Sequence, residues 1–201
     1  MRLTIARYYT PTGRSIQKPY AGGYEDYSNE LYNRMQKGEM ASSDSIHFSD
    51  SLNYITPGGK TVYGGGGIMP DVFVSMDTVG SSQFYAEISS KGMISQFAFD
   101  YLDQHRKMFE EYKSFEDYKN SFKVSDEMYR HFIDYVVKGG VAKNEYGIHA
   151  SSELIHTQIK ALIARQIWKN DGFYPIIQTL DKALTKSLEL IEKKQVAVKG
   201  S

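Results

Sequence analysis

The sequence lacks cysteine, and no run of apolar residues approaches the roughly 20 that span a bilayer. The missing cysteines exclude disulfides and thiolate chemistry without fixing the compartment, because many exported bacterial proteins also lack cysteine. The 24 Lys and Arg residues balance 24 Asp and Glu residues, and no long block of one sign occurs. We therefore expect no nucleic-acid partner and no membrane-spanning segment in this chain.

Enough apolar material is present to build a core, with 41% hydrophobic and 13% aromatic residues. Gly and Ser near residues 79–82 separate a part with strand signals from a part with helical periodicity. The sequence predicts an α+β fold: a few β-strands with a long tyrosine-rich insertion, followed by a C-terminal helical bundle. The expected domains are residues 1–79, with the insertion at 18–66, and residues 80–201.

Short strands are predicted in the first part. Residues 3–9 are β-branched and aromatic and end at Thr10-Pro11-Thr12-Gly13, a composition typical of a tight turn. Residues 60–63 and 71–76 are also predicted as strands, on either side of four glycines at 64–67. Those glycines indicate a backbone bend, because no Lys-Ser or Lys-Thr follows them as in a phosphate-binding loop. A short helix is predicted at 29–35, and the tyrosines of the insertion are expected to be buried.

Four helices are predicted in the second part. Apolar residues at steps of three and four from Ile94 to Tyr112 predict one amphipathic helix, with His105 half-buried. Ser125 is expected to cap a second helix that ends at Gly139-Gly140. A third is predicted over residues 152–169, with Ile167 inward, and a last one begins near Pro175 with apolar residues through Ile191.

One segment carries a resemblance to a known family. The stretch from Arg2 to Gln17, which reads RLTIARYYTPTGRSIQ, resembles the end of the protease core in carboxy-terminal processing, or tail-specific, peptidases. The glycine, apolar, proline, aspartate pattern of residues 67–74 resembles the strand that follows in many members. The matching positions, which we expect to be structural, are Tyr9, Thr10, Pro11, Gly13, Arg14, Gly67, Pro70 and Asp71.

The resemblance implies that the parent protein is a serine endopeptidase of the periplasm or cell envelope that works without a cofactor. Its serine nucleophile and lysine base are expected upstream of Met1, so no catalytic role falls on this fragment, which we expect to be inactive alone. Its partners would be protein or peptide substrates, its own protease core and a second subunit. The alternative is a non-catalytic helical docking module, which would be favoured if Met1 were a natural start.

Other candidate sites have simpler explanations. The five histidines lack the spacing of a helical metal pair, and no cysteine supports them, so no metal site is predicted. Ser151, Ser152 and Glu153 precede His156 but are better explained by the chemistry of a helix start. Arg14 is expected either to pair with an acidic group of the parent enzyme or to be solvated. Aromatic residues typical of interfaces lie along the helices, at Phe115, Tyr118, Phe122, Trp168, Phe173 and Tyr174. Burial inside the bundle is the alternative for this set, and it is the favoured one for Trp168.

Overall fold

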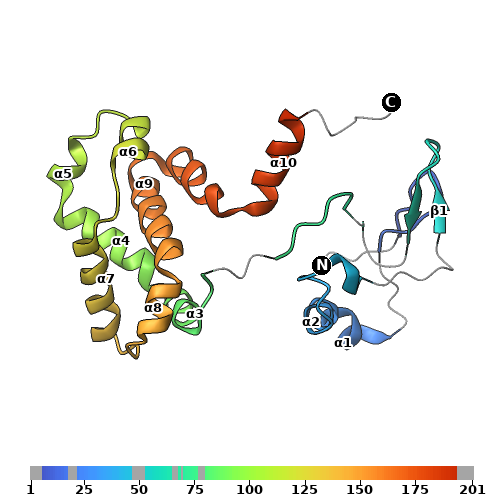
Figure 1. Ribbon diagram of the computed structural model, residues 1–201, viewed down its shortest axis with the longest axis horizontal. Coiled ribbons are helices and arrows are strands. Elements are labelled where there is room, and N and C mark those ends of the chain that lie inside the picture. The colour runs from blue at the N-terminus through green and yellow to red at the C-terminus, as the bar shows by residue number, and fades with distance from the viewer. Residues whose placement is uncertain are drawn as a thin grey trace. The chain divides into compact units, whose positions relative to one another are not determined.

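The computed structural model describes residues 6–17, 22–46, 53–64, 68, 70–76 and 80–193. The chain divides into two compact units, one made of Met1–Met76 with Leu190–Ser201 and the other of Asp77–Glu189 (Figure 1). Helices dominate the described residues, and their only strands form one antiparallel pair. The predicted combination of a helical bundle with a few strands is therefore confirmed.

The first unit contains short elements. It holds α1 (Gly23–Ser28), α2 (Glu30–Gln36), the 3-10 helix η1 (Ser43–Ser45) and a hairpin of β1 (Asn53–Ile55) and β2 (Thr61–Tyr63). In the hairpin, Tyr54 lies opposite Val62. The helix predicted at 29–35 and the strand predicted at 60–63 are confirmed, whereas α1 and β1 were not predicted.

The other two strand predictions fail where they can be checked. Residues 71–76 form no strand, and the Met76 N–H donates to the Met40 carbonyl at 2.8 Å. Of the strand predicted at 3–9, residues 3–5 lie outside the described part of the chain. Residues 6–9 contain a single bridge, from Tyr9 to Ser15. Within the described residues, the two segments do not pair with each other. A strand needs a neighbour whose free backbone groups it can pair with.

The described residues of the first unit form no buried core. Among residues 6–76, no described residue is buried, although apolar side chains are plentiful. Tyr24 is 80% exposed and Tyr32 62%, so the predicted burial of the insertion's tyrosines is wrong for these two. Among the described part of residues 6–76, the large exposed apolar side chains are Tyr8, Tyr9, Ile16, Tyr24, Leu31, Tyr32, Met35, Ile55, Ile68, Val72 and Met76.

The rest of the described chain is helical. It comprises α3 (Gln83–Ser90), α4 (Met93–Gln104), α5 (Arg106–Glu110), α6 (Phe115–Ser121), α7 (Asp126–Lys138), α8 (Glu145–Ala150), α9 (Ser152–Ile177), η3 (Gln178–Leu180) and α10 (Lys182–Glu192). Helix α4 packs chiefly on α9 and also contacts α3 and α7, while α6 packs on α9 (Figure 1). The predicted bundle is therefore organised around α4 and α9.

Aromatic and branched side chains fill the interior of the bundle. Phe97 of α4 meets Phe132 of α7 edge to face, with ring centroids 5.1 Å apart. Tyr118 and Phe132 are fully buried, as are three isoleucines of α9. Burying one such side chain contributes about 1.5–3 kcal/mol, so these contacts dominate the stability of the unit.

Short polar side chains start four of the helices. Ser82, Ser114, Ser125 and Asn144 each accept a hydrogen bond from a backbone N–H of the first turn, at 2.9–3.2 Å. Such caps satisfy donors that a helix start leaves unpaired. The cap predicted at Ser125 and the end predicted at Gly139 are confirmed. The short helices α3, α6 and α8 were not predicted.

Two predicted helices are interrupted in the structure. The stripe from Ile94 to Tyr112 forms α4 and α5, because His105 has non-helical backbone angles (φ −118°, ψ 26°). His105 is exposed rather than half-buried, and its ring stacks on Tyr101 at 4.1 Å. Toward the end of the chain, Asp181 separates η3 from α10, so the last predicted helix is also divided.

A kink at Lys169 divides α9 into two helical stretches. Lys169 has φ 58° and ψ −139°, so the first stretch ends where the sequence predicted an end. Pro175 lies inside the second stretch instead of at its first position. Ile167, predicted to face inward, is 37% exposed, and Leu188 and Ile191 of α10 are 53% and 61% exposed.

Candidate functional site

The signature turn at residues 10–14 is a closed five-residue loop. The Thr10 N–H donates to the Arg14 carbonyl at 2.9 Å, and the Gly13 N–H donates to the Thr10 carbonyl at 2.8 Å. The Thr10 hydroxyl also accepts from the Arg14 N–H at 3.2 Å. Gly13 has φ 78°, a backbone conformation that favours glycine. The positions Thr10, Pro11 and Gly13 are therefore explained by the turn itself.

The same loop occurs a second time, between β1 and β2. Here Thr56-Pro57-Gly58-Gly59-Lys60 follows the pattern Thr-Pro-x-Gly-cation, and Gly59 has φ 79°. The Thr56 N–H donates to the Lys60 carbonyl at 2.9 Å, and the Thr56 hydroxyl accepts from the Lys60 N–H at 3.0 Å. The repeated pattern is visible in the sequence, and comparing the two Thr-Pro segments could have predicted the hairpin.

The cation that closes each loop makes a contact outside it. Arg14 Nη1 donates to the Tyr63 carbonyl of β2 at 3.2 Å, and Arg14 Nε is buried without a hydrogen-bond partner. Arg14 is thus half-buried against the hairpin and is not the fully solvated cation of one of the two expectations. Lys60 pairs with Asp71, but both side chains are more than half exposed, so the pair adds little stability.

Several of the residues that carry the resemblance contact the β1–β2 hairpin, and in the described part of the chain they form no active site. Arg14 lies at the β1–β2 hairpin and Asp71 pairs with the turn of that hairpin, while Gly67 lies outside the described residues. Tyr9 is 61% exposed, and Pro70 is exposed. No hydroxyl in this described set is hydrogen-bonded to a lysine or histidine that could act as its base. Of the matched residues that are described, Thr10, Pro11 and Gly13 form the turn, while Arg14 and Asp71 contact the hairpin.

The serine and histidine side chains of the second unit also fail to form a catalytic set. Ser151 is fully buried, and its hydroxyl bonds to that of Ser82 at 2.8 Å. It makes no side-chain cap of α9, so the explanation from helix-start chemistry is wrong for Ser151. The Ser152 hydroxyl donates to the His149 carbonyl at 2.9 Å. His156 packs its ring against Tyr129, with centroids 4.4 Å apart.

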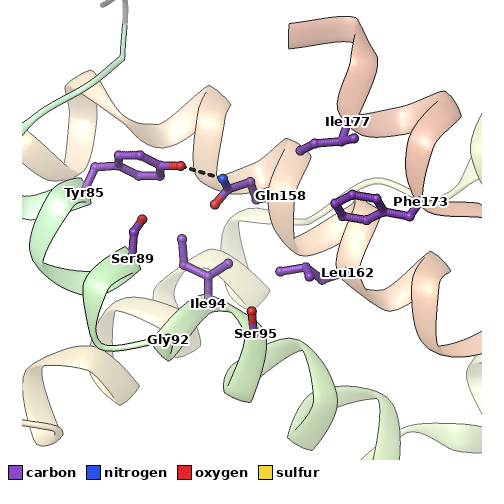
Figure 2. A pocket seen from close by; sticks show the side chains of 9 residues that line it. All are labelled: Tyr85, Ser89, Gly92, Ile94, Ser95, Gln158, Leu162, Phe173 and Ile177. Carbon is purple, nitrogen blue, oxygen red and sulfur yellow. Dashed lines mark hydrogen bonds between the residues drawn. The ribbon is translucent and has the colours of Figure 1, made fainter. Parts of the chain in front are cut away.

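A neutral pocket of about 240 Å³ lies between α3, α4 and α9. Figure 2 shows Ile94, Leu162, Phe173 and Ile177 around it, with Gln158 donating from Nε2 to the Tyr85 hydroxyl at 2.5 Å. The hydroxyls of Ser89 and Ser95 supply further polar groups. With apolar walls and no charged lining residue, this pocket suits an apolar side chain or a small neutral group.

A second cavity is larger, about 450 Å³, and basic. It lies between the end of α6, with residues 122–124 that follow it, and α9, with η3 that follows it. Three lysines line it, Lys119, Lys123 and Lys160. Lys160 Nζ donates to the carbonyls of Lys119 and Phe122, both at 2.7 Å. Burial lowers the pKa of Lys160, and the nearby charges of Lys123 and Lys119 lower it further.

For the six aromatic residues expected either at an interface or inside the bundle, the structure mostly favours the bundle. Tyr118 and Phe122 are buried, and Phe115, Trp168 and Phe173 are half-buried. Tyr174 is 49% exposed. Within the described residues, no cluster of three metal-binding side chains forms, and no helix has the length and apolar character needed to cross a bilayer.

Comparison with known proteins identifies one family. Residues 84–170 match a family of unknown function, DUF8443, over the region from α3 to the kink in α9. No curated protein and no solved structure matches the chain. The bundle is thus similar to other chains of that family, and the match carries no activity with it.

Proposed function

We propose that the chain is the carboxy-terminal part of a carboxy-terminal processing peptidase, a serine endopeptidase of the periplasm or cell envelope. The observation that carries the proposal is that residues 6–76 form ordered turns and a hairpin but bury no described side chain. Local hydrogen bonds alone rarely offset the conformational entropy of ordering such a segment. A larger protein body is therefore needed to cover its exposed tyrosines, and in the proposed enzyme that body is the protease core.

The signature turn supports this assignment. Thr10, Pro11 and Gly13 occupy the positions that a five-residue loop requires, and Arg14 joins the loop to β2. Arg14 Nε remains buried without a partner, so an acceptor from an adjoining body would complete its hydrogen bonding. An acidic group of the core is the natural candidate.

In the proposed enzyme the chemistry is carried out upstream of Met1. A serine hydroxyl attacks the peptide carbonyl, and a lysine takes its proton, which requires burial to lower the lysine pKa from about 10.4. The substrate lies beside the core as an added strand, and backbone donors hold the oxyanion. The present chain completes the core and supplies no catalytic residue.

The test starts with the gene. The reading frame that precedes residue 1 should encode a serine and a lysine in a protease core. The complete protein, incubated with an unfolded protein, should release peptides that mass spectrometry identifies. Cleavage should disappear when that upstream serine is changed to alanine, and the 201-residue chain alone should cleave nothing. A preceding frame without a protease core, or sequence-specific cleavage by this chain, would refute the proposal.

A second candidate function is a non-catalytic docking module, which the apolar face of α10 favours. Leu188 and Ile191 lie one turn apart on that helix and are both more than half exposed. In the parent enzyme such a face would contact the protease core or a second subunit. The two functions are separated by comparing the complete protein with a version that ends near residue 79, using pull-down, sedimentation and a peptidase assay. A docking module that is not part of an enzyme would bind partners but show no cleavage activity.

A further inference from the structure

The basic cavity of the second unit combines three cations with an apolar floor. Phe122 and Ile176 are 6% and 5% exposed and form part of its lining, together with Val124 and Pro175. Lys119, Lys123 and Lys160 line the same cavity, and no acidic residue does. The cavity volume of about 450 Å³ lies within the range of small-molecule sites, which are mostly apolar with a few placed polar groups.

Lys160 has binding capacity left after its structural contacts are made. An ammonium group has three N–H donors, and two of them reach the carbonyls of Lys119 and Phe122. Those carbonyls belong to the end of α6 and the residue after it, where a cation is favourable. The third donor has no hydrogen-bond partner among the described residues, and the ammonium lies 5.9 Å from the centroid of the Tyr118 ring. The carbonyls stabilise the cation as dipoles, without neutralising its charge.

The three lysines also repel one another. The charges of Lys123 and Lys119 lower the pKa of Lys160, in addition to the effect of burial. Lys119 approaches Glu116 at 3.7 Å, outside the cavity lining, and in the described part of the chain neither Lys123 nor Lys160 forms an ion pair. A bound anion would relieve this repulsion and would accept the free donor of Lys160.

We propose that this cavity binds a small organic acid, with its carboxylate at Lys160 and Lys123 and its apolar body on Phe122, Val124 and Ile176. The proposal is independent of the peptidase assignment, because it rests on the helical unit alone. A bare inorganic anion would leave the apolar floor uncovered, and a neutral apolar molecule would leave the lysine charges unpaired. Only a ligand with both parts matches the lining.

The proposal is tested with hexanoate as the probe and the whole 201-residue chain as the receptor. Isothermal titration should show saturable binding of hexanoate, with hexanamide, acetate and inorganic phosphate each at least about tenfold weaker. Amide chemical shifts should change at residues 119–124 and 157–160. Absence of saturable hexanoate binding, or equal affinity for hexanamide or for phosphate, would overturn the proposal.

Two variants locate the site. Lys123→Gln removes an exposed charge of the cavity and should weaken hexanoate binding about tenfold without unfolding the chain. Lys107→Gln removes the same charge from α5, outside the cavity, and should leave the affinity unchanged. Equal losses in both variants would indicate nonspecific attraction and contradict the proposed site. Lys160→Met should abolish hexanoate binding, and circular dichroism checks that this variant keeps its helical fold. If Lys160→Met unfolds, Lys123→Gln still decides the test.

Discussion

The hydroxyl of Tyr118 donates a hydrogen bond to the backbone carbonyl of Lys160 at 2.9 Å, while the Lys160 side chain donates back to two carbonyls at the end of α6. Helices α6 and α9 are therefore joined in both directions, each giving a side-chain donor to the backbone of the other. Tyr118 is fully buried and stacks on Phe122, with ring centroids 4.8 Å apart. The residues of the second contact, Lys119, Phe122 and Lys160, line the basic cavity.

The first prediction concerns that joint. Tyr118→Phe keeps the ring but removes the buried donor, so we expect the free energy of unfolding to fall by about 1 kcal/mol. Urea unfolding followed by far-UV circular dichroism measures the change. Tyr146→Phe is the matched control, because Tyr146 is 82% exposed and its hydroxyl should contribute nothing measurable. Equal stability of Tyr118→Phe and the parent chain would argue against the hydrogen bond.

The second prediction concerns the kink in α9, where a substitution should raise the free energy of unfolding. Lys169 has φ 58°. This backbone conformation lowers the stability of the fold by about 1 kcal/mol for a residue with a side chain, and by little for glycine. Lys169→Gly should therefore stabilise the chain by about 1 kcal/mol. Asn170→Gly, at the neighbouring exposed position, should destabilise it by about 0.3 kcal/mol, because glycine is a slightly poorer helix former than asparagine. Destabilisation by both glycines, measured in urea, would mean that Lys169 has an ordinary helical backbone.

His156 predicts a pH dependence of stability. Burial lowers the pKa of His156 below its ordinary value near 6.5, while Asp126 acts in the opposite direction more weakly. The unfolded chain then binds a proton more readily than the folded one, so stability is lost as the pH falls through 6.5. The urea midpoint should be lower at pH 5.5 than at pH 7.5. His156→Phe should reduce this difference, whereas the exposed control His131→Gln should retain it.

The sequence predicted the elements that carry their own local signals. The Ser125 cap and the Gly139 end define α7, and the Thr-Pro-Thr-Gly turn forms as expected. The short helices α3, α6 and α8 were missed because six to eight residues are too few for periodicity to be recognised. The division of α4 from α5 at His105 was missed for a different reason: the apolar stripe continues across the break, and Phe109 is buried on the far side of it.

The candidate sites were harder to predict than the helices. The basic cavity joins Lys119 and Lys123 to Lys160, which lies about forty residues later, and only the packing of α6 on α9 brings them together. No spacing rule connects those positions. The strand predicted at 71–76 failed because local composition records β propensity but not the presence of a partner strand, and propensity is easily overridden by context.

The last prediction separates the two units of the chain by their local stability. Buried apolar contacts hold α4, α7 and α9 together, whereas no described residue of 6–76 is buried. In the 201-residue chain, amide protons of α9 should therefore exchange at least about a thousandfold more slowly than those of the β1–β2 hairpin, a difference of about 4 kcal/mol. Hydrogen exchange followed by mass spectrometry gives both rates in one sample. In the complete protein that we propose, the hairpin and the turn at Arg14 should become protected, because the proposed protease core would cover them. Protection of the hairpin in the isolated chain to the level of α9 would show that residues 6–76 are stable without a core, and would remove the main support for the peptidase assignment.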